Sequence, residues 1–200
     1  MRIAVLVSGS GSNLQALHDA GDDLGAEIVL VASDKPDAYG LERARNAGIP
    51  TAVVRWADHP DRAAFTAALC DEVEDAGAEA LVLAGFMRIL SAEAVARFPH
   101  CILNIHPSLL PSFPGARAVE DALAHGARVT GVTVHFVDEQ VDHGPIIAQR
   151  PLLIEDGDDA DSLHARIQRI EHQLYPEVVA AFAAGRLFVE DRIVHWEDTA

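Results

Sequence analysis

The chain has 200 residues, half of them hydrophobic, which suits one well-buried domain and excludes a largely disordered protein. Acidic residues outnumber basic ones by 31 to 15, so the net charge of −16 disfavours nucleic acid and anionic membranes as partners. The two cysteines lack the spacing of a disulfide framework or a zinc ribbon, and the first apolar run, at 3–7, is too short for a signal peptide. We therefore expect a metal-free protein of the reducing cytoplasm.

In the first half of the chain a strand, a turn and a helix alternate. The expected order is a strand at 3–7, a helix at 14–20, a strand at 27–32, a helix at 39–47, a strand at 51–54, a helix at 61–76, a strand at 80–84, a helix opening at 91–94 and a strand at 101–104. The strands are almost continuously apolar, which is typical of a parallel sheet covered on both faces. Asp61 is expected to cap the third helix, and Gly48 and Gly77 are expected to end helices.

The second half has a different pattern, because two long strands follow one another without a helix between them. A helix is expected at 118–125, strands at 129–137 and 146–154, a helix at 161–184 and a hairpin at 187–196 that turns at Asp191 and Arg192. The strand at 129–137 alternates, with Thr133 and His135 on the face opposite its valines. The sequence thus predicts one α/β domain over residues 1–200. Its open, twisted, mostly parallel, Rossmann-like sheet would have helices on both faces and antiparallel additions towards the C-terminus.

An amide and an imidazole, Asn104 and His106, stand at the carboxyl end of the strand at 101–104, where open α/β sheets bind their ligands. The prolines at 107, 111 and 114 prevent a helix from starting there. A carboxylate within a few ångströms would orient the imidazole and favour its cationic form. Asp142, on the loop 141–145 between the two late strands, is the best candidate, although solvent exposure is the usual alternative for a loop aspartate. Together the three side chains indicate a catalytic centre.

Residues 8–13 form a glycine-rich turn between the first strand and the first helix, an arrangement typical of phosphate binding by backbone N–H groups. A dinucleotide site is the rival interpretation, because Gly9 and Gly11 match its first two glycines and Asp34 stands near the position of a ribose-binding acid. Leu14 replaces the third glycine, which favours a phosphate monoester. A turn with no ligand is the remaining alternative.

Residues 85–90 follow a buried strand at the same sheet edge, and their apolar side chains with one arginine suit a flat heteroaromatic ligand. The alternative is ordinary hydrophobic packing with Arg88 at the surface. In the long last helix, Glu171 or His172 is expected to face the cleft. Ser108 lacks the G-x-S-x-G turn of a serine nucleophile. No histidine has metal-ligand spacing, and five are expected at the surface: His18, His59, His125, His164 and His195.

Six segments in a fixed order span nearly the whole chain and carry a resemblance. They are SGSGSNLQAL at 8–17, GLERARNAGIP at 40–50, LAGFMRIL at 83–90, LNIHPSLLP at 103–111 followed by FPG, VHFVDEQVDHGPIIAQ at 134–149 and IEHQLYP at 170–176. In these segments the chain resembles the glycinamide ribonucleotide formyltransferase family of purine biosynthesis. The resemblance implies the formyltransferase fold and no metal. It also implies transfer of a formyl group from 10-formyltetrahydrofolate, a cosubstrate, to the glycyl amine of 5-phosphoribosylglycinamide.

The resemblance further implies roles for particular residues. The catalytic residues would be Asn104, His106 and Asp142. The ribonucleotide would be bound through its phosphate by Gly11, Ser12 and Asn13, and otherwise by Gln168, Arg169, Ile170 and Glu171. The folate would contact Arg62, Met87, Arg88, Ile89, Leu90, Asn104, Asp138, Glu139, Gln140, Val141 and Asp142. Many relatives carry a histidine where this chain has Arg117, so no auxiliary imidazole is implied there.

Other functions remain as alternatives. A formyltetrahydrofolate hydrolase shares the Asn–His–Asp chemistry but would carry an added N-terminal domain. A methionyl-tRNA formyltransferase would carry a tRNA-binding domain and a basic surface. A nicotinamide-dependent dehydrogenase would need the glycine that Leu14 replaces, and a non-catalytic nucleotide-binding module would not need Asn104, His106 and Asp142 together. We expect small-molecule substrates, no nucleic-acid or membrane partner, and a monomer or homodimer.

Overall fold

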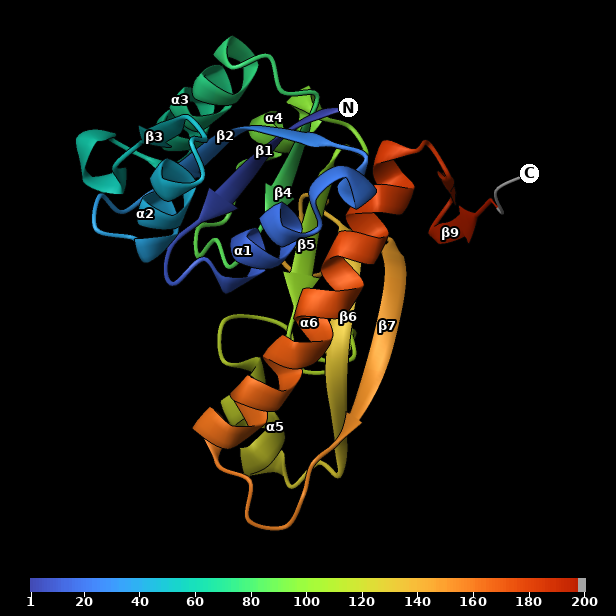
Figure 1. Cartoon of the computed structure of the whole chain (residues 1–200). Coiled ribbons are helices and arrows are strands. Elements are labelled where there is room, and N and C mark those ends of the chain that lie inside the picture. Colours follow the sequence, from blue (N-terminus) through green and yellow to red (C-terminus); the bar gives the residue numbers. More distant parts are fainter. Residues whose placement is uncertain (198–200) are drawn as a thin grey trace.

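A computed structural model of the chain describes residues 1–197 and contains one seven-stranded sheet (Figure 1). Its strands are β1 (Arg2–Val7), β2 (Glu27–Ser33), β3 (Thr51–Val53), β4 (Ala80–Leu83), β5 (Ile102–His106), β6 (Val129–Phe136) and β7 (Ile146–Leu153). They lie in the order β3-β2-β1-β4-β5-β6-β7. The first five are parallel to one another, whereas β6 is antiparallel to both β5 and β7. The predicted open, mostly parallel sheet with antiparallel additions is confirmed.

The helices are α1 (Ser12–Asp19), α2 (Tyr39–Asn46), α3 (Arg62–Asp75), α4 (Ala92–Arg97), α5 (Ala118–His125) and α6 (Ala160–Ala183). Two short 3₁₀ turns, η1 (Gly21–Leu24) and η2 (Trp56–Asp58), were not expected from the sequence. The predicted C-terminal hairpin is present as β8 (Leu187–Glu190) and β9 (Ile193–Trp196). Asp61 caps α3 as predicted, because its side chain accepts a hydrogen bond from the amide of Ala64.

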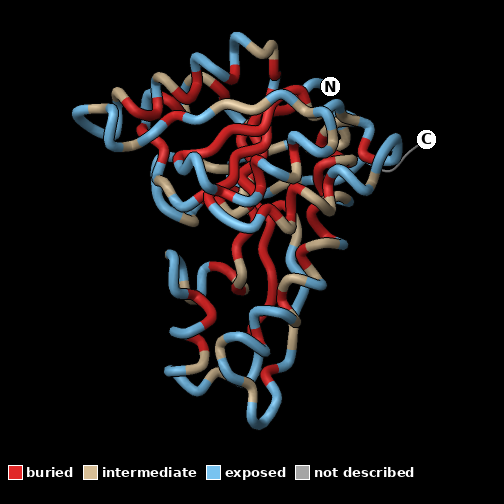
Figure 2. The backbone as a smooth tube through the Cα atoms, turned by 60° about the vertical axis from the view of Figure 1, so that its left-hand side comes forward, coloured by how far each residue is buried: buried red, intermediate tan, exposed pale blue. Residues whose placement is uncertain are grey.

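Helices cover both faces of the sheet, so its central strands are buried from both sides (Figure 2). One hydrophobic core joins the sheet to α1, α2, α5 and α6 and includes Leu14, Leu41 and Tyr175. A second core joins the opposite face to α3 and α4 and includes Phe65 and Leu69. This burial explains why the strands read as continuous apolar runs rather than as alternating ones.

The sheet is uneven at its carboxyl edge, and this unevenness makes room for a site. β4 ends at Leu83, opposite Asn104, whereas β5 continues to His106 with β6 as its partner. Figure 1 shows β5, β6 and β7 continuing beyond the other strands as an extension flanked by α5 and the start of α6. The predicted end of this strand at residue 104 was therefore two residues short. Pairing of His106 with Thr133 prolongs the strand, and one strand's sequence does not reveal that pairing.

Three further local features concern the first helix, a buried thiol and the length of the helices. α1 begins at Ser12, two residues earlier than predicted, because Gly11 in a left-handed conformation (φ 69°) forms its N-cap. Cys70 is fully buried, and burial raises the pKa of its thiol to about 11, so it is protonated at neutral pH. Within residues 1–197, no helix combines the length and the apolar character needed to cross a bilayer.

Candidate active site

A cavity of about 320 Å³ opens where β4 ends and β5 continues. The segment after β4 contributes mostly apolar residues to its lining, and the segment after β6 contributes acidic and amide residues together with two valines. Its lining consists of Leu83, residues 85–90, residues 104–107, Gly115, Ala116, His135 and residues 137–142. The sequence-predicted residues Asn104, His106, 87–90 and 138–142 thus all border one cavity.

His106 and Asp142 come together although they lie on different elements. Nδ1 of His106 lies 3.4 Å from Oδ2 of Asp142, and Nε2 of the same ring lies 2.9 Å from the carbonyl oxygen of Phe113. Because acceptors face both nitrogens, the doubly protonated ring, which donates from both, fits this arrangement. The imidazole is therefore held between a carboxylate and a backbone carbonyl.

His135 is a site residue that the sequence analysis missed. It is buried on β6 directly opposite Asn104, and its Nε2 lies 3.1 Å from Asn104 Nδ2 and 3.7 Å from Asp142 Oδ1. Its Nδ1 lies 2.8 Å from the carbonyl oxygen of Phe136, an acceptor, and its Nε2 faces both the Asn104 amide and the Asp142 carboxylate. The alternation along 129–137 placed His135 on the polar face, but only the pairing of β5 with β6 brings it to Asn104.

The environment of Asp142 keeps it ionised. Burial by itself would raise the pKa of its carboxyl, but the interaction with His135, the amide of Gly115 (2.7 Å) and the positive charge available on the imidazoles outweigh burial, and the pKa lies below its usual range. The residue adopts a left-handed conformation with φ 52°. Two residues later, a side chain at Gly144 would collide with the carbonyl oxygen of Phe136. Glycine there lets the loop pass close to β6 and carry Asp142 into the site.

The glycine-rich turn lies on the other side of β4 and meets α6. Asn13 Nδ2 donates a 3.0 Å hydrogen bond to Oε2 of Glu171, and both side chains are buried. Of the two candidates on α6, Glu171 therefore faces the turn, and its neighbour His172 borders a separate surface groove with Ser12. Gln168 is half-buried and bonds to the ring of His164, whereas Arg169 is exposed and Ile170 packs at the edge of the core.

The arrangement around Asp34 argues against a dinucleotide site. Asp34 is buried, accepts a 2.6 Å hydrogen bond from Ser8 Oγ and forms a 2.7 Å ion pair with Arg88 Nε. Its carboxylate is thus engaged inside the protein and is not free to bind a ribose. Arg88 also lies over the ring of Trp56, 5.2 Å from its centroid. Arg88 is accordingly neither a simple surface residue nor one whose charge is free for a ligand.

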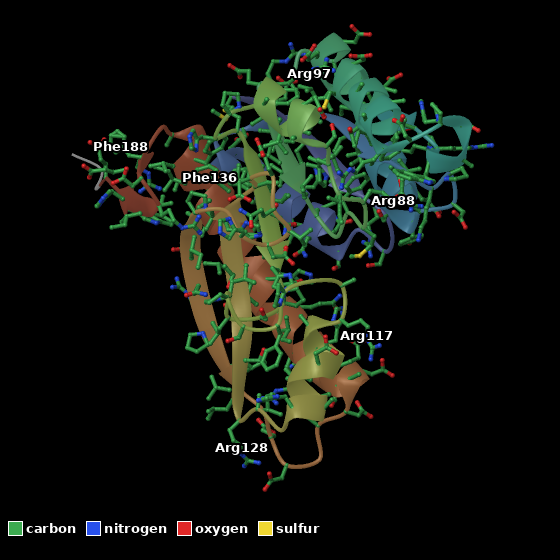
Figure 3. All side chains as sticks on the ribbon, turned by 180° about the vertical axis from the view of Figure 1, so that it is seen from behind. Arg88, Arg97, Arg117, Arg128, Phe136 and Phe188 are labelled. Atoms are coloured by element: carbon green, nitrogen blue, oxygen red, sulfur yellow. The ribbon has the colours of Figure 1, made fainter. Side chains whose placement is uncertain are left out.

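Other predicted residues lie outside the cavity. Arg62 is exposed at the start of α3 and does not line it. Arg117 is exposed before α5, on the extension, and Figure 3 shows it well separated from Arg88.

Ser108 is buried and donates to the carbonyl of Ser112, which leaves it without the exposure of a nucleophile. Four of the five histidines expected at the surface are exposed (His18, His125, His164 and His195), whereas His59 is half-buried beside Phe65. Within residues 1–197 no group of three or more His, Cys, Asp or Glu residues could hold a metal ion.

The chain is similar to known proteins over nearly its whole length. Residues 1–179 match the model of the formyl transferase family. The phosphoribosylglycinamide formyltransferase of Escherichia coli K12 is 43% identical over 99% of this chain and 94% of its own. The solved structure of glycinamide ribonucleotide transformylase 1 from Symbiobacterium toebii has a TM-score of 0.96 and 47% identity, over 99% of this chain and 94% of that one.

Some curated relatives are much longer than this chain. The trifunctional purine biosynthetic protein adenosine-3 of Drosophila melanogaster is 44% identical over 96% of this chain, which spans only 14% of that protein. The resemblance predicted from the sequence is confirmed at the level of the family. By its family match over 179 residues and its full-length likeness to the E. coli enzyme, the chain belongs to the formyl transferase family.

Proposed function

We propose that this protein transfers the formyl group of 10-formyltetrahydrofolate to the glycyl amine of 5-phosphoribosylglycinamide, a step of purine (IMP) biosynthesis. The products are formylglycinamide ribonucleotide and tetrahydrofolate. The observation that carries the proposal is the convergence of Asn104, His106 and Asp142 at one end of the cavity. The full-length likeness to phosphoribosylglycinamide formyltransferases supports this substrate pair.

The cavity suits the formyl donor, and the glycine-rich turn suits the ribonucleotide. Residues 85–90 and 137–142 both line the cavity, and the apolar side chains among them fit a flat pteridine. The glycine-rich turn, with its N–H groups at the start of α1, fits the phosphate of the ribonucleotide. Glu171, beside Asn13, is an acceptor suited to hydroxyl groups between the phosphate and the amine.

In the proposed reaction, the lone pair of the glycyl amine attacks the formyl carbon and produces a tetrahedral intermediate with an oxyanion. The Asn104 amide and the cationic His106 ring are the donors for that oxygen, and one such donor typically stabilises a transition state by about 3 kcal/mol. To reach it, His106 must exchange its bond to the Phe113 carbonyl for one to the oxyanion. The bond from carbon to folate nitrogen then breaks, and the proton lost by the amine passes to that nitrogen through water or His106. Where His106 is the relay, its cationic ring gives a proton to the folate nitrogen and takes the amine proton in exchange, while Asp142 holds the ring in place.

Direct assay tests the proposal. Purified protein is supplied with 10-formyltetrahydrofolate and either 5-phosphoribosylglycinamide or water alone as acceptor, and both folate and ribonucleotide products are measured. We expect formylated ribonucleotide and tetrahydrofolate in equal amounts, with little turnover when water is the acceptor. Equal deformylation with and without the ribonucleotide would instead identify a formyltetrahydrofolate hydrolase.

Variants of the trio test the roles of its members. We expect His106→Ala and Asp142→Ala each to lower kcat by about 100-fold or more. The first variant removes a donor to the oxyanion, and the second removes the carboxylate that holds and charges that donor. Affinity for the ribonucleotide should change little, since the phosphate is held at the glycine-rich turn. His18→Ala and Asp156→Ala, both exposed and remote from the cavity, serve as controls. Near-normal turnover of either trio variant would refute the assignment.

A further inference from the structure

The glycine-rich turn is held in place by α2, an element with no part in the chemistry proposed above. The carbonyl oxygen of Gly9 accepts a 3.0 Å hydrogen bond from the amide of Gly40, and the carbonyl oxygen of Ser10 accepts a 2.8 Å bond from Nε of Arg43. Two successive carbonyl groups of the turn thus point towards α2.

The orientation of these carbonyls decides where the next amides point. In a trans peptide the C=O of one residue and the N–H of the following residue point in opposite directions. Arg43, by binding the Ser10 carbonyl, therefore turns the Gly11 N–H away from α2. That N–H is the first of the amides, at 11–13, that the proposed function assigns to the substrate phosphate. Arg43 thereby presents the donor side of the turn to the ligand.

The contact between α2 and the turn leaves no space for adjustment. A Cβ added at Gly11 would lie 2.5 Å from Gly40 Cα, and one added at Gly40 would lie 2.9 Å from a methyl carbon of Val7. The first turn of α2 is therefore packed directly on the glycine-rich turn, and Arg43, three residues after Gly40, projects back across it.

The guanidinium of Arg43 is also fixed from two further sides. Its Nη1 donates a 3.0 Å hydrogen bond to Oε1 of Gln15 on α1, and its carbon atom lies 4.9 Å from the centroid of the Tyr39 ring. Over residues 1–197, no carboxylate lies within 4.0 Å of it, whereas Arg88, Arg97 and Arg166 are each paired with acids. Arg43 therefore keeps an uncompensated positive charge beside the start of α1, in a chain whose net charge is −16.

We propose that Arg43 is a positioning and specificity-determining residue for the phosphate of the ribonucleotide substrate. It orients the amides of the glycine-rich turn through the Ser10 carbonyl and adds a positive charge next to them. The inference rests on the proposed function, and it assigns Arg43 to recognition of the phosphomonoester alone, not to formyl transfer or to folate binding.

Kinetics of three variants test this assignment. Arg43→Met keeps the length of the side chain without charge or donors, Arg43→Lys keeps the charge without the fork that reaches both acceptors, and Arg45→Met removes an exposed charge from the same helix as a matched control. We expect the KM for the ribonucleotide to rise about tenfold in Arg43→Met, since a good charge-assisted contact is worth roughly a factor of ten in affinity. In Arg43→Lys, which keeps the charge, we expect a rise of about threefold. The kcat and the KM for the formyl folate should stay within about twofold of the parent values, and Arg45→Met should match the parent.

The dephosphorylated substrate, glycinamide riboside, separates recognition of the phosphate from a general structural role. If Arg43 acts through the phosphate, the parent protein and both Arg43 variants have the same kcat/KM on the riboside. An unchanged KM for the ribonucleotide, or an equal loss on both substrates, would overturn the inference. If Arg43→Met folds poorly, Arg43→Lys still tests the inference, because its kcat/KM should fall on the ribonucleotide and not on the riboside.

Binding of inorganic phosphate distinguishes failure of this inference from failure of the proposed function. If the parent protein does not formylate the ribonucleotide, the proposed function is wrong irrespective of Arg43. Phosphate should nevertheless raise the Tm of the parent protein and of Arg45→Met more than that of Arg43→Lys and Arg43→Met. Equal protection of all four proteins would show that Arg43 has no part in holding the anion.

Discussion

The carboxylate of Asp142 is confined between two imidazoles and the amide of Gly115 at a place where its side chain is only 11% exposed. Burial works against its charge, and the three neighbours more than compensate for burial. A carboxylate that stays ionised in such a site remains an acceptor that orients the neighbouring His106 ring. The two imidazoles thus help to keep Asp142 ionised, and Asp142 in turn orients His106.

The lowered pKa of Asp142 predicts how stability depends on pH. A group whose pKa is lower in the folded state adds stability above its unfolded pKa, 3.8, and loses that contribution as pH falls through the folded value. We expect Asp142→Asn to lower the free energy of unfolding by about 2 kcal/mol at pH 7, the usual scale for hydrogen bonds to a charged group. The deficit should persist at pH 5 and shrink at pH 3, because below pH 3.8 the unfolded parent chain binds the proton and the contribution of the ionised carboxylate falls.

Urea denaturation at these three pH values measures the effect, with Asp156→Asn as the control because Asp156 is exposed and paired only with Arg128 at the surface. A deficit that stays constant down to pH 3 would contradict the lowered pKa of Asp142. So would a variant more stable than the parent at pH 7.

Among the elements, α6 does the most to connect the two halves of the site. It carries Glu171, which meets the glycine-rich turn, and one helical turn later Tyr175, which is fully buried. The hydroxyl of Tyr175 donates to the carbonyl oxygens of Leu83 and Leu103, at 2.9 and 3.1 Å. These residues end β4 and precede Asn104, so one side chain joins the helix to both strands at the edge of the cavity. Burial, with a smaller contribution from Glu171, raises the pKa of Tyr175 well above its ordinary value and keeps the hydroxyl a donor.

Removal of the Tyr175 hydroxyl should lower the stability of the protein, because α6 would lose its hydrogen bonds to β4 and β5. Tyr175→Phe keeps the ring and its packing but loses both hydrogen bonds, and we expect the free energy of unfolding to fall by about 1–2 kcal/mol. Tyr39→Phe is the matched control, because Tyr39 is half-exposed on α2 and its hydroxyl makes no hydrogen bond within the described residues; its effect should stay within about 0.5 kcal/mol. Urea denaturation at pH 7 compares the two variants, and equal stabilities would show that the bonds of Tyr175 add nothing.

At the scale of the whole molecule, one sheet separates two hydrophobic cores, and the site lies at the edge that both share. Trp56 packs edge-on against Phe65 in the core under α3, with ring centroids 5.2 Å apart. Trp196 lies on the C-terminal hairpin and donates to the carbonyl of Ile147 on β7 at 3.0 Å. The two tryptophans therefore report on opposite parts of the fold.

Because the two tryptophans lie in different parts of the fold, variants with a single tryptophan can test the prediction of one domain over residues 1–200. Trp56→Phe and Trp196→Phe each leave one fluorescent reporter, and we expect the fluorescence midpoint in urea to coincide with the far-UV circular dichroism midpoint within each variant. Coincidence follows if both cores melt together with the sheet between them. A lower fluorescence midpoint in Trp56→Phe, whose reporter is Trp196, would show that the hairpin and β7 unfold as a separate unit.

Local patterns in the sequence were sufficient for most elements. The strand runs, the cap at Asp61 and the helix over 118–125 were all predicted, because hydrophobic periodicity and capping depend on residues a few positions apart. Local context, a strand end and a loop with glycine and proline, also indicates the catalytic candidates Asn104, His106 and Asp142. The length of β5 was underestimated, since its last residues are held by a partner strand rather than by their own pattern.

The sequence by itself thus determined the α/β class, the family and the residues equipped for chemistry. Only the tertiary structure decided which of them meet: His135 with Asn104 across 31 positions, Asn13 with Glu171 across 158, and Arg43 with Ser10 across 33. The tertiary structure also buries Asp34 against Ser8 and Arg88, so its carboxylate is not available to a ligand. The physical reason is that periodicity records only whether a side chain is buried. Its neighbours depend on strand order and register, which the packing of the complete sheet sets.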